Sequence, residues 1–242
     1  AVCVLKLQEM GLLNINDSIY RYLPKHKFID STITIKQLLN HTSGLTDILK
    51  NGFQNEPFIH PQGDYSDKVL FSRIDTIDFE KGSRYKYCNT NYVVLALIIE
   101  KITGKDFPTY MDETVFKPLG MTNTYIFDNK RVASYVPSYN ARMQPYRLDK
   151  YDCIYGDKNV YSTVRDMFLW DKALTEGKFL APSTLEMAYQ PKSQPNRSFQ
   201  NYGLGWRILS KPNEEKLIYH NGWWHGNNTI FTRLVGETAT II

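Results

Sequence analysis

The sequence has few cysteines and no long apolar run. Its three cysteines, Cys3, Cys88 and Cys153, lie far apart without a Cys-x-x-Cys spacing, which argues against a zinc knuckle or a dithiol redox motif and leaves at least one free thiol. The longest apolar run, Tyr92 to Ile99, is much shorter than the roughly 20 residues that cross a bilayer. We therefore expect no transmembrane segment.

Charge of one sign is not concentrated anywhere either. The 29 Lys and Arg residues are interspersed with 25 Asp and Glu residues, and the formal net charge is +4. A basic nucleic-acid-binding protein is therefore the weakest of the readings considered, and we expect no nucleic-acid partner. What the chain does have is 242 residues with 42% hydrophobic content, which is enough for a substantial core.

Helical patterns occupy the first two thirds of the chain. Cys3, Val4, Leu7 and Met10 repeat at helical spacing, so the sequence begins within a core-facing helix. Because it has neither an initiator Met nor a signal peptide, we expect its start to be truncated.

Two capping signals and one apolar run predict further helices. Thr34 with Gln37 forms a capping box before the helix of residues 35–39, and Thr163 with Asp166 begins a helix that runs to Leu174. The stretch from Tyr92 to Gly104 predicts a helix that is buried on most sides, and a further helix is expected from 107 to 116. Residues 46–81 show no sustained period and are expected to form a long loop.

The last third of the chain has strand patterns. Short segments rich in β-branched and aromatic residues are separated by Gly, Pro and Asn, and they predict strands at 202–209, 216–219, 228–234 and 237–242. Helices followed by closely connected strands indicate an α+β fold with an antiparallel sheet.

Several motifs occur in a characteristic order. They are Gln8-Glu9-Met10-Gly11-Leu12-Leu13, Ile33 to Leu45 with His41-Thr42-Ser43-Gly44, Tyr87-Cys88-Asn89, Pro118-Leu119-Gly120-Met121, Val160-Tyr161-Ser162-Thr163, Tyr202-Gly203-Leu204-Gly205-Trp206 and His220-Asn221-Gly222. Together they resemble the serine β-lactamase, DD-peptidase and esterase family, in particular its branch with class C β-lactamases and D-alanyl-D-alanine carboxypeptidases.

The resemblance implies a β-lactamase/transpeptidase-like α+β fold, with an antiparallel sheet flanked by helices and a mostly helical region. We expect one domain over residues 1–242 that is incomplete at both ends. Residues from about 20 to 155 would form the helical and loop region, and residues 1–19 and 156–242 the helix-plus-sheet region. The resemblance also implies no cofactor and a periplasmic or other extracytoplasmic location.

Two candidate catalytic residues come from the Tyr-x-Asn motif. By resemblance, Tyr87 transfers a proton from the nucleophilic serine, and nearby cations are expected to lower its pKa. Asn89 is expected to direct its amide toward the substrate. Taken alone, Tyr87 is one of 17 tyrosines and reads as a half-buried core residue, and Asn89 reads as a helix cap.

A second set belongs to the His-x-Gly motif, which the family carries on an edge strand. His220 is expected to supply a hydrogen-bond donor or a positive charge that depends on pH around neutrality. Asn221 and Gly222 continue this strand, and Gly222 lets its backbone approach the substrate. The backbone N–H of Trp223 is expected to donate to the oxyanion. Trp223 and Trp224 would line the mouth of the site, or serve as partner-binding or core residues.

The family nucleophile is the serine of a Ser-x-x-Lys motif at the start of a helix. The chain contains one such spacing, Ser83 to Lys86, but it follows Gly82 and has no helical pattern, so we reject it. We expect no nucleophile in this chain, a serine upstream of Ala1, and no acyl transfer by the 242 residues alone.

The resemblance therefore predicts a serine hydrolase that acts through an acyl-enzyme on a β-lactam, a D-amino-acid peptide or an ester. The alternative is a non-catalytic member that binds peptidoglycan fragments or a protein partner. His41 and Ser43 are interpreted as structural turn residues. His220 and His225 could suggest a metal pair, but no third ligand has suitable spacing, so no metal is expected.

Overall fold

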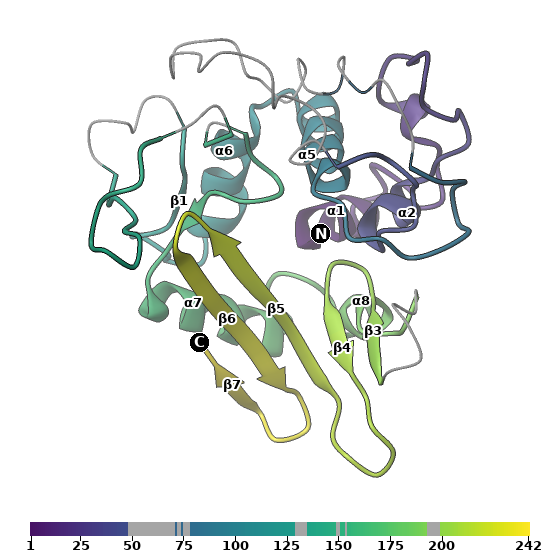
Figure 1. The fold of residues 1–242 in the computed structure, drawn as a ribbon. Helices are drawn as coiled ribbons and strands as arrows, with labels where there is room; N and C mark the ends of the chain where they lie inside the picture. The colour runs from purple at the N-terminus through teal and green to yellow at the C-terminus, as the bar shows by residue number, and fades with distance from the viewer. Residues whose placement is uncertain are drawn as a thin grey trace.

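The computed structural model describes residues 1–47, 71, 74, 78–128, 135–148, 151–152, 154–192 and 199–242. A mostly helical part with long connections lies above an antiparallel sheet, and helices α7 and α8 lie behind that sheet (Figure 1). This arrangement of helices and antiparallel strands confirms the predicted α+β, β-lactamase/transpeptidase-like fold. Most of the loop predicted at 46–81 lies outside the described residues.

The helical part is built from a few short helices around one long one. Its elements are α1 (Val2–Glu9), η1 (Ile19–Arg21), α2 (Ile35–Leu39), α5 (Thr90–Thr103), α6 (Phe107–Met111) and the π-helical η2 (Asp112–Phe116). Helix α5 is buried on most sides, as predicted, and it contacts α1, α2 and α6. It ends at Gly104, whose φ of +69° is the left-handed conformation that glycine adopts readily.

The predicted capping signals are confirmed at two helices. At α2, Thr34 Oγ1 accepts a hydrogen bond from the Gln37 N–H at 3.3 Å, and Gln37 Oε1 accepts one from the Thr34 N–H at 3.0 Å. At α7 (Val164–Thr175), Thr163 Oγ1 accepts from the Asp166 N–H at 3.2 Å. The Asp166 carboxylate does not return to the cap but accepts from the Asn123 N–H and Thr124 Oγ1, both at 2.8 Å.

In the described part of the chain the main sheet has five strands in sequence order, each antiparallel to the next: β3 (Gln200–Tyr202), β4 (Arg207–Leu209), β5 (Leu217–Trp224), β6 (Asn227–Leu234) and β7 (Ala239–Ile241). A second, two-stranded sheet joins β1 (Tyr125–Ile126) to β2 (Val160–Tyr161). Helix α8 (Pro182–Ala188), which lies before β3, was not predicted.

The prediction of one strand at 202–209 is wrong. The Gly203 N–H donates to the Trp206 carbonyl at 2.8 Å, and this tight turn separates β3 from β4. Gly205 has a φ of +88°, and a Cβ atom there would lie 2.2 Å from the Cβ of Ala1. Only glycine therefore satisfies both the backbone conformation and the close approach to the start of α1.

Strand β5 is longer than the predicted 216–219 segment. It continues to Trp224 because a two-residue turn, His225-Gly226, returns the chain directly into β6. Both turn residues have positive φ, +45° and +80°, which matches the twist of a tight hairpin.

One buried charge connects the sheet to the helices behind it. Arg233 on β6 is 5% exposed, and its guanidinium donates to Asp171 and Thr175 of α7 and to the hydroxyl of Tyr189, each at 2.6 Å. Every one of these contacts pairs a buried donor with an oxygen, so the charge is compensated.

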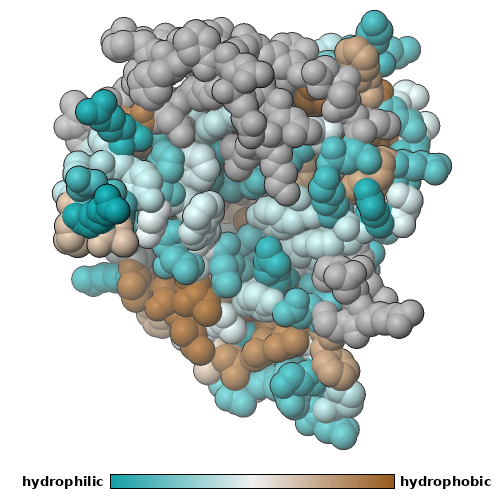
Figure 2. Space-filling model, in the orientation of Figure 1, coloured by the Kyte–Doolittle hydropathy of each residue, from teal (hydrophilic) through white to brown (hydrophobic). Residues whose placement is uncertain are grey.

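The apolar residues behave largely as predicted at α1, where Cys3, Val4 and Leu7 are buried, whereas Met10 follows the end of the helix and is 58% exposed. Figure 2 shows an apolar surface near the β6–β7 end of the sheet, where Ile230 and Ile241 are exposed. Of the helices in the described part of the chain, none is long and apolar enough to cross a lipid bilayer.

Cys3 and Cys88 are free, buried thiols, and burial raises the pKa of Cys3 to about 11 and that of Cys88 to about 12. Cys153 lies outside the described residues.

Candidate active site

The segment before α5 meets the sheet at an aromatic cluster. The ring of Tyr87 lies 6.1 Å from the ring of His220 on β5 and 6.4 Å from that of Tyr202 on β3. The guanidinium of Arg207 on β4 lies 5.2 Å from the centre of the Tyr87 ring. Two residues that the sequence analysis singled out, Tyr87 and His220, are therefore brought together from distant parts of the chain.

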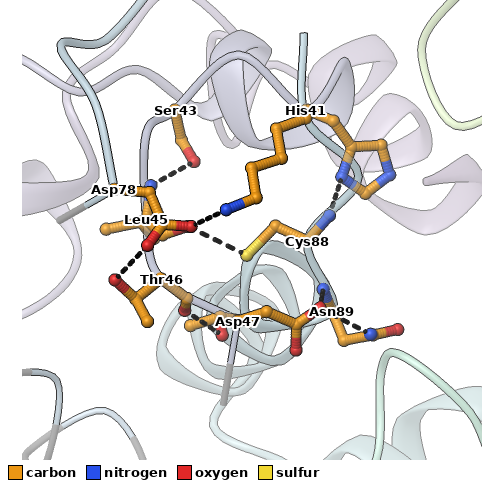
Figure 3. Close-up of polar contacts among 10 residues, drawn as sticks. His41, Ser43, Leu45, Thr46, Asp47, Asp78, Cys88 and Asn89 are labelled. Atoms are coloured by element: carbon orange, nitrogen blue, oxygen red, sulfur yellow. Dashed lines mark hydrogen bonds and ion pairs between the residues drawn. The ribbon is translucent and has the colours of Figure 1, made fainter. Parts of the chain in front are cut away.

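His41 lies at the centre of this cluster and is fully buried. Its ring is 4.2 Å from the Tyr87 ring and 4.8 Å from the Tyr202 ring. Nδ1 of His41 accepts a hydrogen bond from the Cys88 N–H at 3.1 Å, and Asn91 Nδ2 lies 3.3 Å from the same atom (Figure 3 shows the Cys88 bond). The prediction that His41 is a structural hydrogen-bonding residue is confirmed, but its partners are not Thr42 and Ser43.

Tyr202 joins the two histidines. Its hydroxyl oxygen lies 3.2 Å from Nε2 of His41 and 3.2 Å from Nε2 of His220. The side chain is 1% exposed, and burial raises its pKa well above the usual value for tyrosine. Tyr202 is therefore a neutral phenol that contacts the helical part and β5 at once.

The pKa of Tyr87 is raised rather than lowered, which corrects the expectation from the sequence. Burial raises it to about 12, and this effect exceeds the opposing influence of the nearby Arg207 cation. In this structure Tyr87 is a neutral phenol at physiological pH. It can exchange a proton only if another group takes or supplies one in the same step.

His220 is also neutral near physiological pH. Burial, with a smaller contribution from the Arg207 charge, lowers its pKa to about 4. The expectation of a charge that varies around neutrality is wrong for this structure, because the titration is moved well below that range. Nδ1 of His220 lies 2.9 Å from the carbonyl oxygen of Asn221.

The position of His220 within the sheet differs partly from the expected edge strand. Leu217 to Tyr219 pair with both β4 and β6, so this half of β5 is internal. Beyond Tyr219, residues 220–224 pair with β6 alone among the described strands. The half of β5 that carries the His-x-Gly motif therefore has one side that β4 does not cover.

Asn89 occupies the N-cap position of α5, but its side chain makes no capping hydrogen bond. Its Nδ2 donates to Asp47 Oδ2 at 2.9 Å, and its backbone N–H donates to the same oxygen at 3.3 Å (Figure 3). Asp47 is buried and thus fixes the direction of the Asn89 amide. Asn89 therefore lies at the N-cap position, as interpreted, but its side chain does not form the expected capping hydrogen bond.

The remaining residues of the His-x-Gly segment have different surroundings. Asn221 and Trp223 are exposed, and Trp223 is 77% exposed. A Cβ atom on Gly222 would lie 2.5 Å from Thr229 Oγ1 on β6, so the Thr229 side chain would have to rotate to admit a larger residue there. Trp224 is half-buried and donates from Nε1 to Asp152 Oδ1 at 2.7 Å, which attaches the end of β5 to the loop before β2.

The two side chains of the rejected Ser-x-x-Lys pair have separate partners. Residues 83–86 are not helical, as predicted. The Ser83 hydroxyl donates to the Glu80 carbonyl at 2.6 Å, whereas Lys86 forms an ion pair with Asp78. Ser43, the other serine considered, is buried and donates to Asn91 Oδ1 at 2.6 Å.

His225 has partners of its own. Its ring stacks on those of Tyr146 and Trp224, with centroids 5.1 and 4.3 Å away, and its Nδ1 lies 3.5 Å from Asp152 Oδ1. Within the described residues, no group of three or more His, Cys, Asp or Glu side chains is placed to hold a metal ion.

Sequence reasoning missed three residues of this cluster: Arg207, Tyr202 and Asp47. Tyr202 stands in the Tyr-Gly-Leu-Gly-Trp motif, which was used only as a family signature. Arg207 directly follows that motif, and its guanidinium lies over the Tyr87 ring only in the folded chain, where β4 pairs with both β3 and β5. Nothing in the local pattern around Asp47 indicates that it binds Asn89.

Comparison with known proteins places this cluster in context. Residues 1–240 match a family model described as Beta-lactamase. The chain is 29% identical to "Penicillin-binding protein 4*" of Bacillus subtilis (strain 168), with the match covering 100% of the chain and 57% of that protein. The chain spans about half the length of the curated relatives that it matches.

Solved structures show the same fold. An octameric penicillin-binding protein homologue from Pyrococcus abyssi superposes with a TM-score of 0.80 at 21% identity, covering 99% of this chain and 57% of the other. A D-stereospecific amidohydrolase from Streptomyces sp. gives a TM-score of 0.74 at 22% identity, covering 99% of this chain and 76% of the other.

Proposed function

The chain belongs to the beta-lactamase family, and we propose that the complete protein is a serine hydrolase that forms an acyl-enzyme with an amide or ester substrate. In this proposal the nucleophilic serine lies in sequence that precedes Ala1. The 242 residues supply the proton-transfer and substrate-binding side of the site, and they are inactive in acyl transfer on their own.

One observation carries the proposal: Tyr87 and His220, which belong to separate motifs, lie with their rings 6.1 Å apart beside the Arg207 cation. A serine hydroxyl is a weak nucleophile until a neighbouring group takes its proton. In this proposal Tyr87 passes that proton on, because its neutral phenol can accept one proton while it releases another. Because the pKa of Tyr87 is raised, a further cation next to its hydroxyl oxygen would stabilise the phenolate and so favour this proton exchange.

The substrate-binding roles fall to Asn89 and to the open side of β5. Asn89 presents an amide whose direction Asp47 fixes, so it loses little freedom when it meets a substrate carbonyl. The backbone N–H of Trp223 lies on the part of β5 that β4 does not pair with, where it can donate to the oxyanion of a tetrahedral intermediate.

The substrates that we propose are a β-lactam, a D-amino-acid peptide or an ester. The names of the relatives support this class, since they include penicillin-binding proteins and a D-stereospecific amidohydrolase. Substrates of this kind also suggest an extracytoplasmic location. The exposed indole of Trp223 offers apolar contact for a bulky substrate group.

The test uses a longer chain that carries the sequence before Ala1. A fluorescent penicillin or a fluorophosphonate should label one serine on the N-terminal side of Ala1. Tyr87→Phe should slow labelling by about 10² to 10⁴-fold, the usual contribution of a positioned proton-transfer group. Tyr85→Phe is the matched control, because it removes a neighbouring hydroxyl from the same cluster and should leave the rate nearly unchanged.

Three results would contradict the proposal. Labelling that is equally fast with Tyr87→Phe would remove Tyr87 from proton transfer. Absence of labelling, together with binding of peptidoglycan fragments to the same cluster, would instead favour a non-catalytic binding protein. Labelling of Ser43 or Ser83 in the 242-residue chain would show that the nucleophile had been assigned wrongly.

A further inference from the structure

A continuous line of hydrogen bonds crosses from the helical part to β5. It runs from the backbone N–H of Cys88 to His41, from His41 to Tyr202, and from Tyr202 to His220, where it ends on the Asn221 carbonyl. The four donor–acceptor distances are 3.1, 3.2, 3.2 and 2.9 Å. We call this line the histidine relay.

At the Cys88 end of the histidine relay, only one assignment of donor and acceptor is possible. A backbone N–H can only donate, so Nδ1 of His41 has to accept the bond from Cys88 and carries no proton. Asn91 adds a second donor to the same atom, since Ser43 donates to Asn91 Oδ1 and thereby turns the NH₂ of Asn91 toward His41. Burial keeps the pKa of His41 well below its ordinary value, so the ring is neutral and its single proton is on Nε2.

The other end is fixed in the same way. The Asn221 carbonyl oxygen can only accept, so Nδ1 of His220 has to carry the proton of its neutral ring. Nε2 of His220 is then an acceptor, and the Tyr202 hydroxyl donates to it. The Tyr202 oxygen meanwhile accepts from Nε2–H of His41. Within the histidine relay every proton between Cys88 and Asn221 thus has one donor and one acceptor. The Tyr202 hydroxyl also has a second hydrogen-bonding neighbour, the hydroxyl of Tyr92, which donates its own proton to the Leu39 carbonyl.

We propose that His41 and Tyr202 are positioning residues that hold His220 in its neutral, Nδ1-protonated tautomer. Through this tautomer the relay fixes the orientation of the Asn221 carbonyl, and with it the peptide that leads to Gly222 on the open side of β5. His220 then offers neither a free donor nor a charge to the substrate. Its contribution to acyl transfer, which rests on the function proposed above, is to keep the substrate-binding strand in one orientation.

The surroundings of His220 agree with a neutral ring. The charge of Arg207 on β4 acts on it and lowers its pKa. The rings of Tyr87 and Tyr202 pack against His220, and the hydroxyl of Tyr202 connects His220 to His41 in the relay. Both phenols are neutral at physiological pH because their pKa values are raised. Within the described residues, no carboxylate is in contact with His220 that would favour its charged form.

The first experiment measures the tautomers directly. The chain contains five histidines, so ¹⁵N-histidine labelling with assignment by single His→Gln variants gives a resolved long-range ¹H–¹⁵N spectrum. At pH 7 we expect His41 as the Nε2–H tautomer and His220 as the Nδ1–H tautomer. A histidine side chain free in water prefers Nε2–H, so an Nε2–H signal for His220 in the unaltered chain would overturn the proposal.

The second experiment breaks the histidine relay in the middle. Tyr202→Phe keeps the ring but removes the hydroxyl, so His220 should become a mixture of tautomers, and its pKa should rise by about one unit because its neutral form loses a hydrogen bond. Tyr85→Phe, whose ring lies 5.5 Å from Tyr202, is the matched control and should change neither signal. An unchanged tautomer and pKa of His220 in Tyr202→Phe would overturn the proposal.

The third measurement separates this inference from the proposed function. In the longer chain, Tyr202→Phe should slow acylation by about fivefold, the loss expected for one hydrogen bond. If the tautomers are as expected but no serine is acylated, the relay stands and the proposed function fails. If acylation proceeds but His220 is the Nε2–H tautomer, the function stands and the relay fails.

Discussion

The segment around His41 and Tyr87 and the strand around His220 meet in one cluster, yet they are held in opposite ways. The first is held from inside the protein: His41 is fully buried, and Ser43, Cys88 and Asn91 are buried around it. The second extends beyond its neighbour β4, and Trp223 near its end is 77% exposed. One side of the candidate site is therefore part of the core, whereas the other depends on a small number of contacts near a hairpin.

This difference shows which changes should affect stability and which should affect only the site. Removing a group from the His41 side leaves buried donors without partners, and such donors are costly. Removing a group from the end of β5 exposes it further to water, which costs little. The four predictions below test this contrast, beginning with the largest expected effect.

The largest effect is expected for His41→Ala. This change leaves the buried Cys88 N–H without its acceptor and opens a cavity among aromatic rings, so the free energy of unfolding should fall by about 3 to 5 kcal/mol. Urea unfolding followed by tryptophan fluorescence measures it. His220→Ala, on the other side of the cluster, should cost clearly less, and an equal or greater loss would show that the two sides are held alike.

Acidification should destabilise the protein through the same two rings. His41 and His220 both have pKa values below that of an unfolded histidine, so the unfolded state binds more protons. The stability from their neutral forms is present above the unfolded pKa of about 6.5 and is lost as the pH falls below it, for His220 toward its folded pKa of about 4. Each histidine adds a slope of up to about 1.4 kcal/mol per pH unit.

Urea unfolding at several pH values between 7 and 5 checks this slope. His220→Gln should reduce it, because one of the two titrating rings is gone. The range avoids carboxylates such as Asp30, whose pKa is lowered to about 2 by hydrogen bonds from Thr32 and by Lys81. A stability that rises on acidification from pH 7 would contradict the assignment of neutral histidines.

A smaller effect is expected when Arg207 loses its charge. Because this guanidinium lowers the pKa of both His220 and Tyr87, Arg207→Gln should raise both, and for His220 by about one unit or less. An NMR titration of His220 measures the change. Lys216→Gln, a charge removal one residue before β5, serves as the control, and an equal shift in both variants would mean that Arg207 has no particular role.

The smallest effect on stability is expected for Trp223→Ala, at about 0.5 kcal/mol or less, because the side chain is exposed. Trp224→Ala is the contrasting variant and should destabilise the protein more, since Trp224 is half-buried and hydrogen-bonded to Asp152. Thermal unfolding should separate the two. If both variants are equally destabilised, the end of β5 is held more firmly than its exposure suggests.

Much of the fold could be predicted because its signals are local. The capping box of Thr34 and Gln37 and the C-terminal Gly104 depend on residues a few positions apart, and the structure contains both. The division of 202–209 into two strands could not be predicted from strand propensity. The turn there depends on the close approach of Gly205 to Ala1, which is distant in sequence.

Part of the membership of the candidate site could be predicted, but its electrostatics could not. Motif order indicated that Tyr87 and His220 belong together, and the structure places them side by side. The signs of their pKa shifts depend on burial, which no motif records, so the expected low pKa of Tyr87 was wrong. The catalytic roles of Tyr87, Asn89, His220 and Trp223 remain predictions.

The buried Arg233 also has a consequence for how the sheet assembles. Side chains alternate between the two faces of a strand, so a shift of β6 by one residue would turn Arg233 away from Asp171, Thr175 and Tyr189. A buried guanidinium without these partners is strongly unfavourable, whereas a displaced leucine or threonine would be tolerated far better. A single arginine can thus reject misaligned hairpins while the chain folds.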